Sequence, residues 1–304
     1  MLDEKISPML AYSSDSFDSP RHIFEIKWDG TRCILFINGK NIRLQNRRLL
    51  DITDRYPELH GIYKAVNAKN TILDGELIAL SEGKPDFKKL QQREHISDPF
   101  KIRILSREIP ITYIVFDLLY LNDKRYTDAP LLNRKDLLAK ILLESPLIIE
   151  SQYISENGKS FFRKTIEQGL EGIMAKSIHS PYLIGKRSRY WLKIKPKNSA
   201  VCYVIGYTKG KGFRTPVFGA LALATREKDK WVYRGRVGSG FSEVDTGIIS
   251  SRLIQLKIDS PPSPELKKVK GIQWLRPELR CEVIFQEETE KGHFRAPVFK
   301  RLSE

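Results

Sequence analysis

Short strand-type runs separated by turn residues dominate the first fifty residues of the chain. The runs "HIFEIK", "RCILFI" and "NIRLQN" have strand character, and Asn38-Gly39 joins the last two. An Asn-Gly pair between two such runs favours a two-residue β-hairpin. Lys27 ends the first run, and Asp29-Gly30 makes the turn into the second. The chain is therefore expected to begin with antiparallel sheet rather than with packed helices.

Strands and helices alternate up to about residue 197. Further strands are predicted in "TILDGELIAL", "ITYIVFDLLYL", "GLEGIMAK" and "RYWLKIKP". Helices are predicted over residues 54–66, 86–93 and 158–168, and in "RKDLLAKILLE", where apolar residues recur at helical spacing. We expect an α+β domain over residues 1–197.

The pattern changes from residue 198 onward to short strands separated by glycine. The strands are "AVCYVIGYT", "GALALAT", "KWVYRGRVG" and "LRCEVIFQEE", with a helix near 242–257 and a loop at 260–264. About five short strands and one helix are typical of an oligonucleotide-binding (OB) fold β-barrel. Residues 198–304 are expected to form this second domain, joined to the first by a hinge near 196–200.

The charge of the chain favours a polyanionic partner. The 304 residues carry a formal charge of +15, divided almost evenly between residues 1–197 and 198–304. A distributed excess suits a surface that wraps nucleic acid, although a solvated basic surface is the alternative. No apolar window could cross a bilayer and no secretory signal is present, so a cytoplasmic, nucleoid-associated protein with no membrane partner is expected.

Cysteine and histidine usage excludes two kinds of site. Cys33, Cys202 and Cys281 are odd in number and far apart, which argues against a disulfide framework or a paired-cysteine zinc site. The five histidines are scattered, which argues against a caged transition metal. Any metal is expected to arrive with a phosphate substrate.

Lys27 is the candidate nucleophile. An amine attacks only after it loses its proton, and burial or nearby cations favour that loss. Lys27 ends an apolar strand pattern, and other cations recur at the ends of later strand-like runs. A surface lysine in a hairpin is the alternative.

Three further pairs of charged residues accompany Lys27. Alternation places Asp74 and Glu76 on one face of a strand, Glu171 and Lys176 on another strand, and Lys193 and Lys195 on one face of a third. Each pair alone could be a solvated strand face. Together with Arg32, they could hold a nucleoside triphosphate and Mg²⁺ in a common cleft.

The order of these motifs resembles the covalent nucleotidyltransferases, which include ATP-dependent DNA ligases, RNA ligases and mRNA capping enzymes. The motifs are Lys27-x-Asp29-Gly30-x-Arg32, Asp74-Gly75-Glu76, Phe116-Asp117, Glu171-Gly172 with Lys176, and Lys193-x-Lys195. The segments "FKKLQQR", "GRVGSGF" and "EVIFQEETEKGHFRAPVF" further resemble the ligase module of ligase D, the end-joining enzyme. The resemblance spans nearly the whole chain and implies an ATP-dependent DNA ligase.

The resemblance also implies a role for each matching residue. Lys27 would attack the α-phosphate of ATP and hold AMP as a phosphoramidate, with Lys193 and Lys195 steadying that phosphate. Glu171 and Glu76 would bind Mg²⁺ or Mn²⁺. Glu76 would also contact the ribose side of the nucleotide, and Arg32 the ribose or the end phosphate. Phe116 would stack on adenine, although an ordinary core phenylalanine is the alternative. The full implied nucleotide-binding set is Glu25, Lys27, Arg32, Arg47, Glu76, Phe116, Lys176, Lys193, Lys195 and Arg295.

Two segments depart from the family pattern. Ligases usually carry Ser-Arg-x-Gly after the first hairpin, whereas this chain has Asn46-Arg47-Arg48-Leu49 and no glycine there. Arg47 is preferred for the nucleotide, and Arg48 stays open. In the last motif, which orients pyrophosphate, Arg295 in "HFRAPVF" fits best and Arg301 less well.

Two basic segments are expected to bind the DNA backbone. "TKGKGFRTP" contains Lys209, Lys211 and Arg214, and "GKRSRYW" contains Lys186, Arg187 and Arg189. Phosphate contacts from such segments would position a duplex without reading its sequence. Solvated basic loops are the alternative.

Partners and rival functions follow from the same resemblance. Only 26 residues precede Lys27, so a minimal, monomeric two-domain core is expected, acting on double-stranded DNA with nicks or ends. A Ku-like end-binding protein and a separate polymerase are possible partners. An RNA ligase or GTP-using capping enzyme is one rival; a DNA-binding scaffold without catalysis is another, against which the intact Lys27 and Glu171 argue.

Overall fold

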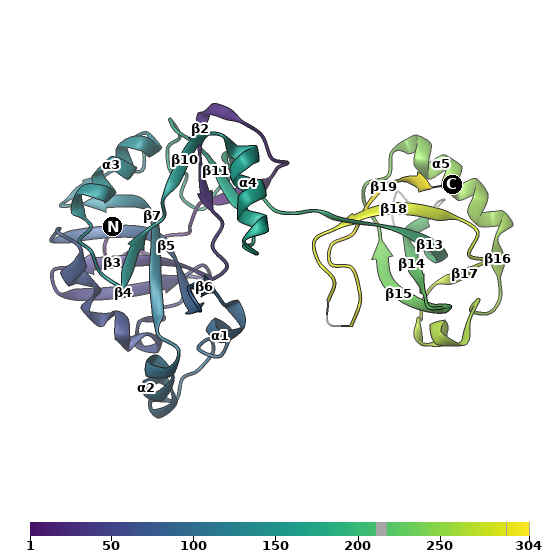
Figure 1. Cartoon of the computed structure of the whole chain (residues 1–304), viewed down its shortest axis with the longest axis horizontal. Coiled ribbons are helices and arrows are strands. Elements are labelled where there is room, and N and C mark those ends of the chain that lie inside the picture. The colour runs from purple at the N-terminus through teal and green to yellow at the C-terminus, as the bar shows by residue number, and fades with distance from the viewer. Residues whose placement is uncertain (211–217, 290, 304) are drawn as a thin grey trace. The chain divides into compact units, whose positions relative to one another are not determined.

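The computed structural model describes residues 1–210, 218–289 and 291–303. The chain divides into two compact units, Met1–Lys195 and Pro196–Glu304 (Figure 1). Among the described residues, no helix is long and apolar enough to span a membrane.

The first unit is built on two sheets, which confirms the predicted α+β class. The five-stranded sheet has the order β1 (Leu10–Ser13), β12 (Arg187–Ile194), β11 (Ile173–Ser177), β2 (Ser19–Ile26), β10 (Tyr153–Glu156). The seven-stranded sheet has the order β4 (Asn41–Asn46), β3 (Thr31–Asn38), β5 (Asn70–Ser81), β7 (Ile111–Leu121), β8 (Lys124–Arg125), with β6 (Lys84–Pro85) beside β5 and β9 (Ile148–Glu150) beside β7.

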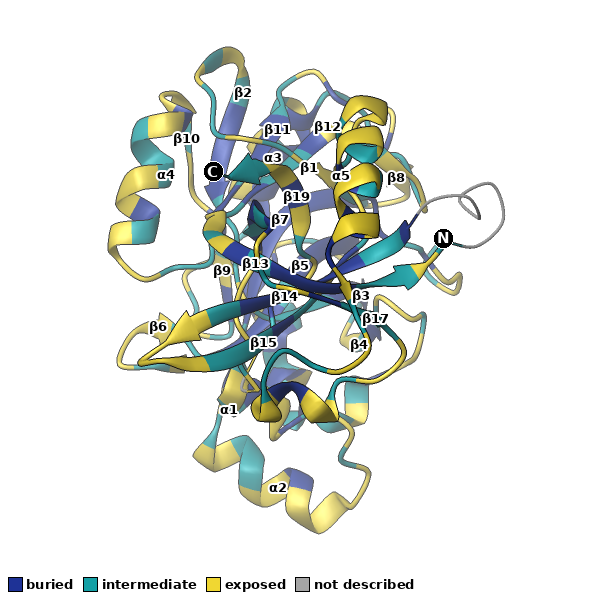
Figure 2. Cartoon of the chain, turned by 90° about the vertical axis from the view of Figure 1, so that its right-hand side faces the viewer, coloured by how far each residue is buried: buried dark blue, intermediate teal, exposed yellow. Residues whose placement is uncertain are grey.

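Alternation along the strands separates three apolar layers. On β3, Leu35 packs beneath the helices η2 (Pro57–Ala65), α1 (Phe87–Gln91) and α3 (Leu131–Ile141). Ile34, on the opposite face of β3, packs with Trp191 of the other sheet. Phe24 of the five-stranded sheet packs against α4 (Gly158–Glu167). Helix α2 (Pro99–Glu108) is exposed over most of its length (Figure 2).

The predicted turn at Asp29-Gly30 connects two sheets instead of two paired strands. β2 before it lies in the five-stranded sheet, and β3 after it lies in the seven-stranded sheet. Lys27 follows β2 directly, and its amide donates to the carbonyl of Gly172 (2.9 Å). The candidate nucleophile therefore lies where the chain crosses from one sheet to the other.

Two local predictions differ from the structure. The helix predicted over residues 54–66 is a pair of 3₁₀ segments, η1 (Thr53–Arg55) and η2. The buried residues of η2 are Leu59, Ile62 and Ala65, and this three-residue spacing matches the 3₁₀ period rather than the α-helical one. The hairpin near Asn38-Gly39 forms, but Asn38 pairs with Asn41, so Gly39 and Lys40 make the turn.

The second unit is a β-rich fold centred on β13 (Asn198–Lys209). Its first half pairs with β18 (Arg280–Phe285), and its second half with β17 (Gln273–Leu275), while β14 (Phe218–Glu227) runs along it. The other elements are β15 (Lys230–Val237), α5 (Glu243–Gln255), β16 (Lys257–Ile258), η4 (Pro264–Lys268) and β19 (Val298–Ser303). The two faces of β13 contribute to two apolar clusters, one of which includes α5. A curled sheet that shares one strand in this way, with one helix against it, is consistent with the predicted OB fold.

Candidate active site

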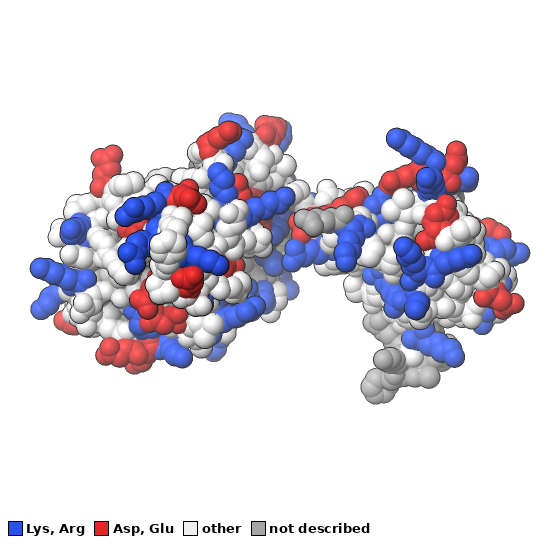
Figure 3. All heavy atoms as spheres, turned by 90° about the horizontal axis from the view of Figure 1, so that it is seen from below, with Lys and Arg blue, Asp and Glu red and all other residues white. Residues whose placement is uncertain are grey.

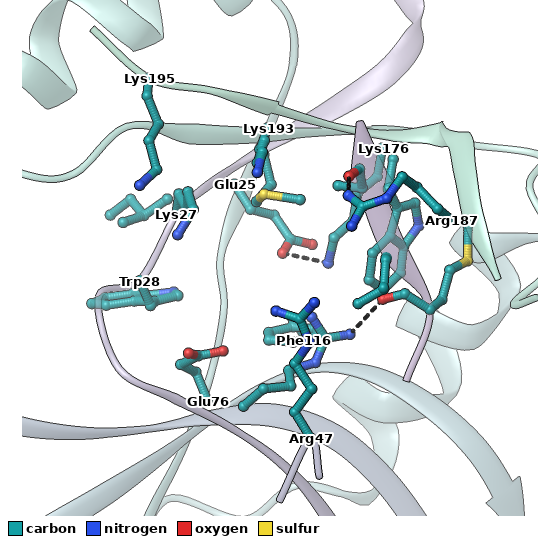
Figure 4. A pocket seen from close by; sticks show the side chains of 17 residues that line it. Glu25, Lys27, Trp28, Arg47, Glu76, Phe116, Lys176, Arg187, Lys193 and Lys195 are labelled. Atoms are coloured by element: carbon teal, nitrogen blue, oxygen red, sulfur yellow. Dashed lines mark hydrogen bonds and ion pairs between the residues drawn. The ribbon is translucent and has the colours of Figure 1, made fainter. Parts of the chain in front are cut away.

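A cavity of about 280 Å³ in the first unit collects residues from both sheets (Figure 4). Nine residues expected to bind the nucleotide line it: Glu25, Lys27, Arg32, Arg47, Glu76, Phe116, Lys176, Lys193 and Lys195. Arg48 is exposed and is absent from this lining. Among its charged lining residues, seven lysines and arginines thus surround two carboxylates, those of Glu25 and Glu76.

Strand alternation explains how the five-stranded sheet supplies its part of the cavity. On β12, Trp191 and Lys193 point into the cavity while Ile194 packs toward α4. Lys195 follows the end of β12 and continues the same alternation. The predicted common face of Lys193 and Lys195 therefore corresponds to one wall of the cavity.

Glu171 lies between two lysines. Its carboxylate contacts the Nζ atoms of both Lys27 and Lys195. The expectation that Glu171 shares a strand with Lys176 is wrong, because β11 begins at Ile173 and Glu171 lies in the preceding loop. Gly172 allows this approach: its φ is +147°, and a Cβ there would lie 2.2 Å from the Ile194 carbonyl oxygen.

Arg32 is fixed against a buried carboxylate. Its Nε and Nη2 donate to the two oxygens of Asp74 at 2.6 and 2.5 Å, and Tyr182 donates its hydroxyl to the same carboxylate at 2.5 Å. Burial alone would lower the pKa of Arg32, but attraction to Asp74 raises it. The guanidinium also lies 4.5 Å from the Phe116 ring centroid. Arg32 is thus a permanent, oriented cation in the wall.

Lys176 lies between two aromatic rings. Its Nζ is 4.3 Å from the centroid of Phe116 and 4.4 Å from that of Trp191. It donates to Oε2 of Glu25 at 2.8 Å, a contact drawn in Figure 4. Burial lowers the pKa of Lys176 to about 8, against the opposing attraction of Glu25. Phe116 therefore contacts two cations, Lys176 and Arg32, where it lines the cavity. It also packs in the apolar layer that contains Trp191.

Two other groups in the cavity have shifted pKa values. Burial raises the pKa of Glu76 to about 8, although Arg32 and Lys27 oppose this shift. Burial and the neighbouring charge of Lys195 lower the pKa of Lys193. The cavity therefore contains groups that titrate near neutral pH, as sites of proton-dependent chemistry commonly do.

The carboxylates present suit a hard divalent cation. Among the described residues, no group of three or more His, Cys, Asp and Glu side chains could hold a metal ion. Mg²⁺ is commonly bound by one or two carboxylates together with substrate phosphates. Glu171 and Glu76 fit that pattern and do not fit a metal cage made by the protein alone.

Some lining residues were not predicted. Trp191 occurs two residues before Lys193, so alternation could have placed it on the same face. Trp28, next to Lys27, also lines the cavity. Met9, Leu10 and Ala11 do so because β1 pairs in parallel with β12, and nothing local in the sequence predicts that pairing.

The candidate DNA-binding residues fall into three groups. Lys186, Arg187 and Arg189 are all exposed, and of the three only Arg187 lines the cavity. Arg189 lies 5.3 Å from the ring of Tyr12. In the second unit, Lys209 lines a groove with Arg236. Lys211 and Arg214 lie outside the described residues. Lysine and arginine side chains are spread over the visible face of each unit (Figure 3).

Both arginines considered for the last motif have acidic partners in the second unit. Arg295 donates to Glu287 at 2.5 Å, and both side chains are exposed. Arg301 donates to Glu282 at 2.8 Å. Each would have to exchange its carboxylate for pyrophosphate to act as expected.

Comparison with known proteins gives consistent matches for both units. Residues 8–195 match the family model described as "ATP dependent DNA ligase domain", and residues 214–304 match "ATP dependent DNA ligase C terminal region". The crystal structure of the ligase domain of LigD from M. tuberculosis aligns with a TM-score of 0.57 at 26% identity, covering 98% of this chain and 95% of that one.

Two curated relatives have similar identity. A DNA ligase of Nitrosopumilus maritimus is 33% identical over 279 residues, which are 87% of this chain and 47% of that protein. The multifunctional non-homologous end joining protein LigD of Mycolicibacterium smegmatis is 30% identical over 305 residues, 98% of this chain and 38% of that protein. The chain thus spans less than half the length of these two relatives.

Proposed function

Because this chain belongs to the ATP-dependent DNA ligase family, we propose that it joins DNA through an AMP intermediate carried on Lys27. The observation that supports this most is the grouping of Lys27 with Lys193, Lys195 and Arg32 around one cavity that also holds Glu76. Such a set of cations suits a triphosphate, and the neighbouring amine suits attack on it.

In the first step, Lys27 Nζ forms a bond to the α-phosphorus of ATP while the bond to the pyrophosphate oxygen breaks. Lys193 and Lys195 lie on the wall beside Lys27, where their charges would stabilise the α-phosphate as negative charge develops on it. Arg47, also in the lining, would bind phosphate oxygens at the cavity mouth. Positioning and electrostatics supply most of the rate in such in-line displacements.

Glu171 contacts Lys27 Nζ, so this contact must be exchanged, and Nζ must give up a proton to solvent, before the amine attacks. We assign Glu171 and Glu76 as the protein ligands of Mg²⁺ or Mn²⁺. A divalent cation there would neutralise phosphate charge and compete with Lys27 for Glu171. The raised pKa of Glu76 lets its carboxyl keep a proton near neutral pH, and this proton would have to leave when the carboxylate binds the cation.

The adenine end of the nucleotide is assigned to the aromatic part of the cavity. Phe116 would stack on adenine once Lys176 or Arg32, which lie 4.3 and 4.5 Å from its ring centroid, moves aside. The buried pair of Glu25 and Lys176 offers a hydrogen-bonding acceptor and donor. AMP then passes from Lys27 to a DNA 5′-phosphate, and the 3′-hydroxyl displaces it to seal the strand. Lys186, Arg187, Arg189 and Lys209 are assigned to the DNA backbone, with Arg295 assigned to pyrophosphate.

We further propose a role in end joining on chromosomal DNA, with a Ku-like protein as partner. The similarity to LigD of M. smegmatis over 98% of this chain supports this choice. A pull-down with the cognate Ku protein and an end-joining assay test it. Absence of both binding and stimulation would leave nick sealing as the activity.

The decisive experiment is transfer of α-labelled nucleotide to the purified protein with Mg²⁺, comparing ATP with GTP and wild type with Lys27→Ala. Intact-mass measurement first shows whether Lys27 already carries AMP. We expect label from ATP, absent in Lys27→Ala, that chases into sealed nicked DNA. Label from GTP would indicate a capping-type enzyme, and no label on unadenylated protein would support a scaffold.

A further inference from the structure

The short segment that carries Lys27 is tied at both ends to one buried polar bridge. After Lys27, the indole N–H of Trp28 donates to Oγ of Ser151 at 3.1 Å. Before it, Oε1 of Glu25 lies 2.8 Å from Nζ of Lys135. Lys135 also donates to the carbonyl oxygen of Ser151 at 2.9 Å, which closes a ring through residues 25–28.

The bridge itself is anchored to rigid elements. The amide of Ser151 donates to the Val115 carbonyl on β7 at 2.8 Å. Lys135 lies on α3, where its neighbour Arg134 binds Asp117 of β7 through two hydrogen bonds of 2.7 and 2.8 Å. The bridge therefore belongs to the seven-stranded sheet and its helix, whereas Glu25 belongs to the other sheet. It connects the two sheets where the chain passes between them.

Burial makes this arrangement costly for a purely structural link. Glu25, Lys135 and Ser151 are each about 1% exposed. Packed apolar residues often give as much stability as a buried ion pair, so we take the geometry that this pair imposes as its role. Here that geometry includes Lys27, and it extends to the cavity because the second oxygen of Glu25 binds Lys176.

We propose that Ser151 and Lys135 are positioning residues for the attack by Lys27. By fixing Trp28 and Glu25, they hold the backbone on both sides of the nucleophile, so that Nζ projects into the cavity (Figure 4). Neither residue lines the cavity, so neither would touch ATP. This inference rests on the proposed function and concerns its first step.

The test is a double-mutant cycle in the full chain with Trp28→Phe and Ser151→Ala. The measured quantity is the single-turnover rate constant for labelling of Lys27 at saturating α-labelled ATP. Ser151→Ala should slow labelling roughly tenfold, because a slightly misplaced nucleophile loses much of its rate. The ATP concentration for half-maximal rate should stay unchanged in that variant. Both substitutions remove the same hydrogen bond, between Trp28 and Ser151. The rate constant of the double variant should therefore equal that of the slower single variant within about twofold.

Ser180→Ala is the matched control. Ser180 is also 1% exposed and donates its hydroxyl to the Ser177 carbonyl at 2.7 Å, outside the bridge. It should label at the wild-type rate. The role of Ser151 would be overturned by any of three results. The double variant could lose rate by the product of the two single losses, Ser180→Ala could slow labelling as much as Ser151→Ala does, or Ser151→Ala could label at the wild-type rate.

Lys135→Met tests the other half of the bridge. It should slow labelling tenfold or more, by the same reasoning, at a temperature where hydrogen exchange shows β2 and β7 folded. Folded Lys135→Met protein that labels at the wild-type rate would remove Lys135 from the proposal. Wild-type protein that never labels would instead overturn the proposed function, so the two failures are distinguishable.

Discussion

Glu171 contacts Lys27 and Lys195 at the same time, so the candidate nucleophile and a candidate phosphate-binding lysine share one carboxylate. Glu171→Gln keeps the shape of this side chain but removes its charge. We expect transfer of AMP to Lys27 to fall by roughly a hundredfold, because the variant loses a carboxylate assigned to the divalent cation that would neutralise the phosphates. Single-turnover labelling with α-labelled ATP measures it.

Glu167→Gln, an exposed acid on α4 in the same region of the chain, is the control and should label normally. Normal labelling of Glu171→Gln would contradict the assignment of Glu171 to the reaction.

Asp74→Asn should destabilise the first unit. It removes the charge of the buried carboxylate whose two oxygens accept from Arg32, and leaves a half-buried guanidinium without its counter-charge. Breaking a buried pair in this way typically costs about 3–5 kcal/mol. Urea titration followed by hydrogen exchange in β5 reports the free energy of unfolding of this unit separately. Glu4→Gln, at an exposed pair with the N-terminus, should cost less than about 1 kcal/mol.

The stability of the first unit should depend on pH through Glu76. Its pKa is raised from 4.5 to about 8, so between these values the folded state keeps a proton that the unfolded state has released. The free energy of unfolding should therefore fall as pH rises through this window, by up to about 1.4 kcal/mol per pH unit for one proton. Glu76→Gln should lack this component.

Between about pH 5 and 7 the difference between wild type and Glu76→Gln isolates Glu76, because the lowered pKa of His22 and the raised pKa of Glu150 are common to both proteins. The lowered pKa of Lys176 acts with the opposite sign, adding stability as pH rises between about 8 and its ordinary value of 10.5. A wild-type slope identical to that of Glu76→Gln would show that the carboxyl is ionised throughout.

Arg189→Ala should weaken DNA binding in a salt-dependent manner. Each phosphate contact contributes about 0.9 to the slope of log affinity against log salt, so losing one should reduce the slope by that amount. Fluorescence anisotropy with a nicked duplex at several salt concentrations measures it. Lys140→Ala on α3, also exposed, is the control. Equal slopes in Arg189→Ala and wild type would argue against a phosphate contact.

Local patterns predicted much of the first unit. Alternation in "WLKIK" placed Lys193 and Lys195 on one face, and both line the cavity. The position of Glu171 was harder, because Gly172 has a positive φ of +147° and the strand begins only after it. Whether a charged residue lies on a strand or just before it depends on such backbone detail, which apolar periodicity does not encode.

Contacts between distant segments were beyond local patterns. The bridge joins Trp28 to Ser151 and Glu25 to Lys135, and no spacing within the sequence relates these pairs. For the same reason, the sequence did not predict that the strands before and after Lys27 lie in separate sheets. The turn at Asp29-Gly30 was predictable, but the pairing partners of each strand depend on packing across the domain.

Trp191 belongs at once to the cavity wall and to the apolar layer between the two sheets. Lys193 lies on β12 of the five-stranded sheet, and Lys195 directly follows that strand. Arg32 and Glu76 lie on β3 and β5 of the seven-stranded sheet. The apolar layer consequently acts as a spacer between the two charged walls of the cavity. If a nucleotide binds there as proposed, its fit would depend on the volume of a core side chain such as Trp191, with every charged residue left as it is.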